Sequence, residues 1–162
     1  RRAWTLPVPS SAKEVVVTEV DAGPLATATK LGADIAIDIA ATPDALAPYC
    51  RDKGTFDVLF EASGNERALA GGLEAVRPGG TVVQVGIGSQ MTLPISVIVT
   101  KELKLFGTFR FDVEFQLAVE LMSRGQVDLK PLVSATLPFD RAVEAFALAG
   151  DRSRSMKVQL VF

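Results

Sequence analysis

The sequence predicts an α/β fold in which a doubly wound parallel sheet lies between two layers of helices. Apolar strand patterns alternate with helix patterns from Glu14 to Arg110. The intervening helices are long enough to return the chain across a sheet, which favours right-handed crossovers and parallel strands. Proline and glycine stand at several helix beginnings and ends, as they do at real helix boundaries. A length of 162 residues suits one domain.

The first part of the chain supplies two predicted strands with a helix between them. Lys13–Asp21 has the pattern of a buried strand that ends in acids, and Asp34–Ile39 alternates apolar and polar residues as a short strand does. Pro24 begins the helix, which continues to Leu31. A short helix over Pro43–Cys50 follows.

The middle of the chain repeats this alternation. Its predicted elements are a strand over Phe56–Glu61, a helix over Asn65–Val76, a strand over Thr81–Val85, a helix within Leu93–Leu103 and a strand over Lys104–Arg110. Asn65 is a suitable N-cap because its side chain can accept a bond from an amide of the first helical turn. The Pro-Gly-Gly sequence before Thr81 indicates a turn.

Beyond Asp112 the pattern changes to longer helical and extended segments. The predicted elements are an amphipathic helix over Glu114–Arg124, an extended segment over Val127–Phe139, a helix over Arg141–Ala149 capped by Asp140, and a strand over Met156–Phe162.

Composition excludes several classes of function. With a net charge of -2, the chain has no basic field to attract nucleic acid or an anionic membrane surface. No apolar run reaches the roughly 18 residues that a membrane span needs. A single cysteine, Cys50, cannot form an internal disulfide, and this suits a reducing compartment. We therefore expect a cytoplasmic protein with no nucleic-acid or membrane partner.

Candidate binding residues follow the predicted strands, because ligands of open parallel sheets bind at the carboxyl ends of the strands. An acid after a strand can accept bonds from both ribose hydroxyls of NAD. A small turn lets a flat ring or a sugar lie against the backbone, and Gly86 and Gly88 are expected to permit close approach of a ligand and to offer free amides. The candidates are Glu19, Asp21, Ala62, Ser63, Gly64, Val85, Gly86, Ile87, Phe109 and Arg110.

Each candidate also has a purely structural interpretation. Glu19 suits a solvated turn, and Arg110 suits a surface position. Gly86-Ile87-Gly88 is not a phosphate-binding motif, because no third glycine and no lysine follow it. The order of these features along one sheet, rather than any single one, predicts a site for NAD.

Two features of a complete NAD-binding enzyme are missing from the pattern. The glycine-rich phosphate loop should lie roughly 20 residues before the acid, yet Arg1–Ala12 contains no glycine. With no histidine and one cysteine, the chain cannot supply the usual ligands of a catalytic zinc, so we predict no catalytic and no metal residue. We expect an irregular lead-in over 1–12 and an NAD-binding domain over 13–162, truncated at its N-terminus. The strand that comes before such a loop would also be absent from the sheet. Ala3–Val8, a partner chain or a rearranged strand would take its place.

The motifs together resemble the cofactor-binding domain of zinc-type medium-chain alcohol and polyol dehydrogenases. The polyol branch, which contains the sorbitol and L-idonate 5-dehydrogenases, is the most similar, and the resemblance covers about residues 13–162. The matching segments are Val17–Glu19, Leu31–Asp34, Phe56–Val58, Glu61–Gly64, Arg77–Gly80, Val85–Gly86, Lys101–Leu103, Gly107–Phe111, Ala142–Phe146 and Lys157–Val158.

This resemblance implies a Rossmann-like fold and a role for each candidate. Glu19 would bind the ribose, and Ala62–Gly64 would line the adenosine. Val85–Ile87 would flank the nicotinamide, with Phe109 and Arg110 over its carboxamide. The complete enzyme would oxidise a secondary alcohol or polyol, with zinc bound by a separate catalytic domain. The resemblance also implies a homodimer that pairs Lys104–Arg110 across a two-fold axis.

Two other classes of function remain open from the sequence. A methyltransferase of the same layered fold also places an acid after its second strand, but its sheet should finish with an antiparallel hairpin after Thr81–Val85. A non-enzymatic dimerising scaffold is the third possibility, and the missing phosphate loop favours it. Nucleotide binding combined with an intact-mass measurement would separate the three.

Overall fold

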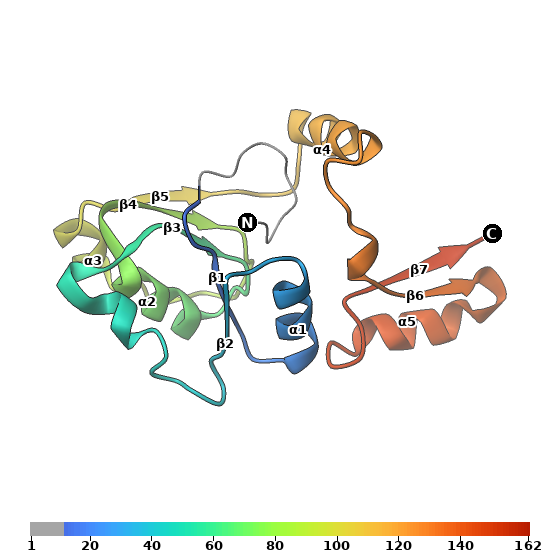
Figure 1. Ribbon diagram of the computed structural model, residues 1–162, viewed down its shortest axis with the longest axis horizontal. Helices are drawn as coiled ribbons and strands as arrows, with labels where there is room; N and C mark the ends of the chain where they lie inside the picture. Colours follow the sequence, from blue (N-terminus) through green and yellow to red (C-terminus); the bar gives the residue numbers. More distant parts are fainter. Residues whose placement is uncertain (1–11) are drawn as a thin grey trace. The chain divides into compact units, whose positions relative to one another are not determined.

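The computed structural model describes residues 12–162, which form two compact units (Figure 1). One unit contains residues 12–43 and 112–162, and the other contains residues 44–111. The predicted lead-in over 1–12 and the proposed strand at Ala3–Val8 lie, except for Ala12, outside the described residues. Among the helices of residues 12–162, none is long and apolar enough to cross a membrane.

The first unit contains two pairs of parallel strands. Strand β1 pairs with β2 from Val16↔Ile35 to Glu19↔Asp38, and β6 pairs with β7. The elements are β1 (Val16–Glu19), α1 (Ala22–Lys30), β2 (Ile35–Asp38), α4 (Val113–Ser123), η2 (Lys130–Leu132), β6 (Val133–Pro138), η3 (Phe139–Arg141), α5 (Ala142–Gly150) and β7 (Lys157–Val161). The other elements agree with the predicted strands and helices within a few residues at each end, but the predicted extended segment Val127–Phe139 contains the short helix η2, and its strand begins only at Val133.

The predicted cap at Asp140 is wrong. Asp140 lies inside the short 3-10 helix η3, and Arg141 is the residue that precedes α5. No side chain caps the first turn of α5. The aspartate is therefore part of a helical turn and cannot take the extended conformation that an N-cap residue needs.

The second unit is a three-stranded parallel sheet with the order β3-β4-β5. Its elements are η1 (Ala47–Lys53), β3 (Phe56–Glu61), α2 (Glu66–Ala75), β4 (Val76–Gln84), α3 (Ile95–Thr100) and β5 (Lys104–Gly107). Asn65 caps α2, since its side chain accepts bonds from the amides of Arg67 and Ala68. Strand β5 runs parallel to β4, which contradicts the antiparallel ending expected of a methyltransferase. The predicted parallel α/β fold is confirmed.

In the second unit, two strand boundaries differ from the prediction by three residues or more. Strand β4 begins at Val76, which pairs with Phe56 before an irregularity and the resumed pairing of Val58 with Thr81. Strand β5 ends at Gly107 instead of Arg110. Arg110 has a φ of 56°, in the left-handed region, so the chain cannot continue there as a strand.

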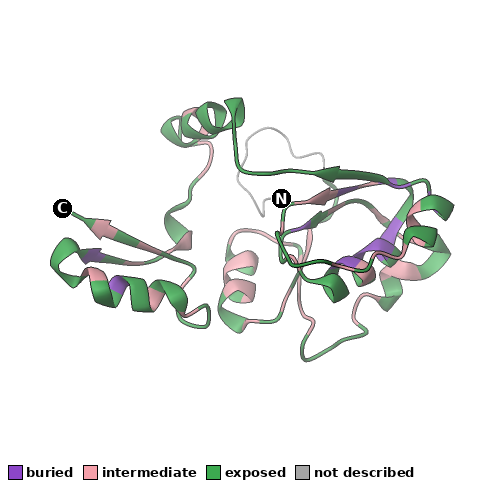
Figure 2. Ribbon diagram, turned by 180° about the vertical axis from the view of Figure 1, so that it is seen from behind, coloured by how far each residue is buried: buried purple, intermediate pink, exposed green. Residues whose placement is uncertain are grey.

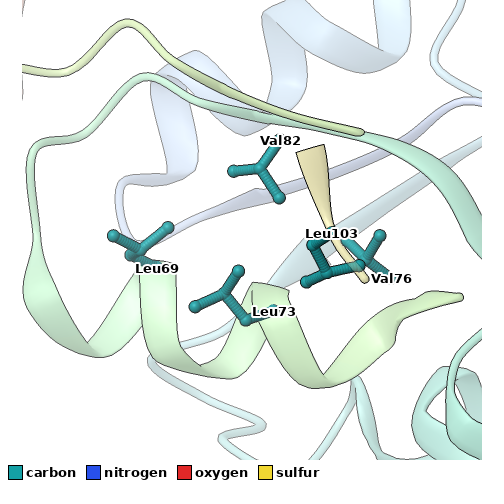
Figure 3. Close-up of a cluster of buried hydrophobic side chains, with 5 residues drawn as sticks. All are labelled: Leu69, Leu73, Val76, Val82 and Leu103. Carbon is teal, nitrogen blue, oxygen red and sulfur yellow. The ribbon is translucent and has the colours of Figure 1, made fainter. Parts of the chain in front are cut away.

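The second unit is built around one apolar cluster between α2 and the sheet. Figure 3 shows its five buried side chains, which come from α2, β4 and the residue before β5: Leu69, Leu73, Val76, Val82 and Leu103. The buried residues in Figure 2 are concentrated on α2 and β4 for this reason. Because burial of a leucine or valine side chain stabilises a fold by about 1.5–3 kcal/mol, this cluster fixes the helix against the sheet.

A buried lysine closes the C-terminal end of α2. Lys101 is 7% exposed, and its ammonium group donates to the carbonyl oxygens of Leu73, Glu74 and Val76 at 3.1, 2.7 and 3.1 Å. The carboxylate of Glu74 lies 3.7 Å from the same nitrogen. The last carbonyls of a helix have no partner within the helix, and a cation there also interacts favourably with the helix dipole. Lys101 therefore connects α2 to the chain that leads into β5.

Replacement of Lys101 should destabilise the fold strongly. Lys101→Met keeps the apolar stem but leaves three carbonyl oxygens without their donor, so we expect a loss of about 2–4 kcal/mol in the free energy of unfolding. Lys53→Met, at an exposed lysine of the same unit, is the control and should change it by less than about 0.5 kcal/mol. Denaturation in urea measures both. Equal midpoints for the two variants would show that Lys101 is not a structural support.

Candidate functional site

The carboxyl ends of β3 and β4 meet around a buried carboxylate that sequence reasoning did not single out. Glu61, the last residue of β3, is only 4% exposed. Its Oε1 accepts the amides of Ser63 and Gly64 at 2.8 and 3.1 Å and the hydroxyl of Ser63. Its Oε2 accepts the Gly64 amide at 3.0 Å and the side-chain amide of Gln84 at 2.5 Å. The predicted turn Ala62–Gly64 is therefore held by this carboxylate, which bonds to both Ser63 and Gly64.

The charge of Glu61 is stabilised in spite of its burial. Desolvation raises the pKa of this carboxyl, but the hydrogen bonds from Ser63, Gly64 and Gln84 together outweigh it and hold the pKa below its ordinary value. A buried ionised group is tolerated only when such donors satisfy it. The carboxylate is thus ionised at neutral pH and acts as an acceptor.

The turn Ala62–Gly64 packs directly against the turn Val85–Ile87, so the structure brings two predicted parts of the site together. The amides of Val85 and Gly86 both donate to the carbonyl oxygen of Glu61 at 2.8 Å. A Cβ atom on Gly64 would lie 2.7 Å from the carbonyl carbon of Ile87, and one on Gly86 would overlap the amide nitrogen of Gly64. Only glycine permits backbones to approach so closely.

This packing corrects the expected role of the glycines. Gly86 was expected to offer a free amide to a ligand, but its amide donates to the carbonyl of Glu61. The amides of Ser63 and Gly64 are likewise used by the carboxylate of Glu61. The amides of Ser63, Gly64, Val85 and Gly86 are therefore used within the chain and are not free to bind a ligand.

Both apolar and polar side chains surround these turns. Val85 and Ile87 are 44% and 75% exposed. An open hollow of about 430 Å³ lies beside Gly64; its other lining residues are Asn65, Glu66, Arg67, Ser89, Gln90 and Met91. The exposed apolar side chains of Val85 and Ile87 offer contact area for a ring, and the polar side chains that line the hollow offer hydrogen-bonding groups.

Phe109 and Arg110 follow the end of β5. The guanidinium of Arg110 lies 5.1 Å from the centre of the Phe109 ring, a cation–π distance. The amide of Thr108 donates to the carbonyl of Gln84 at 3.0 Å, so the chain still follows β4 one residue beyond β5. Phe109 is 68% exposed and available to a ligand.

In the first unit, carboxylates gather at the end of the β1–β2 pair. Glu19 ends β1, and its Oε1 accepts the amides of Val20 and Asp21 at 2.7 and 3.3 Å. Asp21 precedes α1 and makes no capping bond. Asp38, which the sequence analysis did not select, pairs with Glu19 in the strand register and accepts the amides of Ala40 and Ala41. The predicted acidic strand end thus carries one more negative charge than expected.

Two arginines distant in sequence lie near the beginning of α1. Arg152 and Arg154 line a hollow of about 110 Å³ together with Gly23 and Pro24. Arg154 is 4.0 Å from the carboxylate of Asp151. From the sequence, the nearest basic residue after the acids was Lys30, so the local pattern could not reveal these two.

The residues present do not fit a zinc ion. Within residues 12–162, no group of three histidine, cysteine, aspartate or glutamate residues is arranged to hold a metal. Burial raises the pKa of the Cys50 thiol, which donates to the carbonyl of Leu46 at 3.3 Å. A raised pKa lowers the fraction of thiolate, the form that acts as a nucleophile and metal ligand.

Comparison with known proteins assigns the family. Residues 10–124 match the family described as zinc-binding dehydrogenase. The chain belongs to this family. It is 38% identical over 152 residues to L-idonate 5-dehydrogenase (NAD(P)(+)) of Escherichia coli strain K12. The aligned segment covers 93% of this chain and 44% of that protein. It is 34% identical over 141 residues to sorbitol dehydrogenase of Ovis aries, with 83% and 39% covered.

A solved zinc-binding dehydrogenase has the same fold. The crystal structure of L-idonate 5-dehydrogenase from Escherichia coli K-12 superimposes with a TM-score of 0.87 over 93% of this chain and 43% of the other. The chain therefore spans less than half the length of these relatives. The predicted Rossmann-like fold and the resemblance to zinc-type alcohol and polyol dehydrogenases are confirmed.

Proposed function

We propose that this chain is the NAD-binding part of an oxidoreductase that acts on a secondary alcohol or polyol. The observation that carries the proposal is the acidic end of β1 in a member of the zinc-binding dehydrogenase family. A carboxylate at this point suits the two ribose hydroxyls of NAD. The name of the L-idonate 5-dehydrogenase relative supports a dinucleotide cofactor and a polyol-type substrate for the complete enzyme.

The proposed contacts follow from what each segment offers. Glu19 and Asp21 accept bonds from the adenosine ribose, and Ala62, Ser63 and Gly64 line the adenosine side by shape. The exposed apolar side chains of Val85 and Ile87, with Gly86 between them, flank the nicotinamide. Phe109 and Arg110 cover its carboxamide. NAD accepts a hydride when bound, and these residues bind and orient it without moving a proton.

The proposed location is the cytoplasm, where a lone thiol stays reduced. Neither nucleic acid nor a membrane is proposed as a partner, because the net charge of -2 supplies no attractive field for their phosphates.

The chain should bind NAD more tightly than NADP. Glu19, Asp21 and Asp38 would repel the additional 2′-phosphate by about 1–3 kcal/mol, which is roughly 5- to 150-fold in affinity. The double variant Glu19→Ala/Asp21→Arg should shift the preference toward NADP. Fluorescence titrations with NADH and NADPH measure both affinities.

The arginines near α1 provide the decisive control for this preference. Arg152→Ala should leave the affinity for NADH unchanged. If the unmodified chain binds NADPH as tightly as NADH, and Arg152→Ala removes that binding, the guanidinium holds the phosphate and the assigned NAD preference is wrong.

We further propose a homodimer through the outer edge of β5, over Lys104–Arg110. Strand β5 ends the order β3-β4-β5, and Leu105 and Phe106 are 43% and 55% exposed. An apolar edge strand is a surface that pairs readily with another strand.

Phe106→Lys should weaken this dimer about tenfold or more, because a charge is placed in the paired edge. Val143→Lys, at a residue of α5 that is 87% exposed, is the control and should leave association unchanged. Light scattering over a concentration series gives the dissociation constants. A monomeric mass for the unmodified chain at high micromolar concentration would contradict the proposal.

This chain alone should show no dehydrogenase activity. It has no histidine and one cysteine, whereas a catalytic zinc needs three protein ligands. The assay follows NADH absorbance with purified chain, zinc, NAD and a panel of polyols. Turnover that persists after contaminating enzymes are removed would show that the chain contains a catalytic centre of its own.

A further inference from the structure

We propose that Glu61 is a positioning residue that holds the turns Ala62–Gly64 and Val85–Ile87 in the one arrangement able to receive the cofactor. The proposal rests on the function proposed above for these turns. No predicted contact with NAD involves Glu61, and its carboxylate is too buried to be a ligand of the cofactor. Its role would be exerted through the backbone amides of Ser63 and Gly64 and through the side chains of Ser63 and Gln84.

The bonds of Glu61 reach both turns from one point. Its carboxylate receives the amides of Ser63 and Gly64, while its backbone carbonyl receives the amides of Val85 and Gly86. The side chain and the main chain of one residue therefore satisfy four amides in two separate segments. Buried amides that lose their acceptor are costly, so the turn Ala62–Gly64 has little freedom while the carboxylate is ionised. The amides of Val85 and Gly86 are held by the main chain of Glu61 in either ionisation state.

Gln84 extends the same network across the sheet. Its Nε2 donates to Oε2 of Glu61 at 2.5 Å and to the carbonyl of Gly86 at 2.8 Å. Its Oε1 is buried without a partner within the described chain. Reversal of this amide would place that oxygen against two acceptors, so the bond to Glu61 determines the orientation of Gln84. The second turn is thus linked to the carboxylate through the side-chain amide of Gln84.

Glycine spacing makes the arrangement dependent on this residue. A Cβ atom on Gly86 would lie 2.7 Å from Oε2 of Glu61 and would overlap the amide nitrogen of Gly64. The carboxylate therefore occupies the space between two closely packed backbones. A side chain at position 61 with a donor in place of Oε2 would face the donors of Gly64 and Gln84.

Amide hydrogen exchange on the whole chain tests the proposal directly. In Glu61→Gln, the amides of Ser63 and Gly64 should exchange about tenfold faster, while that of the core residue Val82 should change less than about twofold. Glu102→Gln carries the same charge change at an exposed residue of this unit and should alter neither rate. Unchanged exchange at Ser63 and Gly64, or equal acceleration at Val82, would overturn the positioning role.

Acid titration provides a readout that works even if Glu61→Gln does not fold. Because the pKa of Glu61 is lowered in the folded chain, its contribution to stability is complete above the ordinary value of 4.5 and is lost as the pH falls through the lowered pKa. The amide shifts of Ser63 and Gly64 in the unmodified chain should change together in that range below 4.5. Different midpoint pH values for the shifts of the two amides would contradict the proposal, and so would amide shifts that stay constant until the chain unfolds.

A cofactor titration separates this inference from the proposed function. If NADH binds the unmodified chain, Ser63→Ala, which removes one donor, should weaken it less than Glu61→Gln does. Equal affinity in Glu61→Gln, in spite of faster exchange of its turns, would overturn the positioning role. If the unmodified chain does not bind NADH, the proposed function fails, and the exchange rates still decide whether Glu61 orders the two turns.

Discussion

The carboxylate of Glu61 is the constraint on which the second unit's candidate site depends. Parallel strands place their carboxyl ends side by side, so the turns that follow β3 and β4 lie in close contact. Glycines at positions 64, 86 and 88 let these turns come together, and the buried carboxylate satisfies the amides that the close packing would otherwise leave without acceptors. The site is therefore a consequence of satisfying polar groups at a sheet edge.

Two buried charges at opposite ends of α2 organise this unit. Lys101 satisfies the last carbonyls of the helix, and Glu61 orders the turn that leads into its first residue. The apolar cluster between helix and sheet lies between them. Since removal of either charge leaves unpaired groups rather than a simple gap, both positions should tolerate substitution poorly. The same helix thus connects the stability of the core with the geometry of the turns.

Much of the fold could be predicted from the sequence, because its strands and helices have strong local signals. Phe56–Glu61 was predicted at both ends, and the cap at Asn65 has the contacts expected of it. The end of β5 could not be predicted, because nothing in the sequence around Arg110 indicates that this residue takes a left-handed conformation.

The candidate site was predicted less completely than the fold. The turns were located, but the pattern could not reveal that Glu61 is buried, that Asp38 pairs with Glu19, or that Arg152 lies near α1. These features depend on contacts between residues far apart in the chain. Polar residues carry no periodic signal that would show their partners, so only the folded chain reveals them.

The central claim is that the turns after β3 and β4 form one surface for a dinucleotide, and amide chemical shifts during an NADH titration test it most directly. The account predicts shift changes at Ser63, Gly64 and Gly86, all with one dissociation constant. Different dissociation constants for the turn Ala62–Gly64 and the turn Val85–Ile87, or no shift change at millimolar NADH, would contradict it.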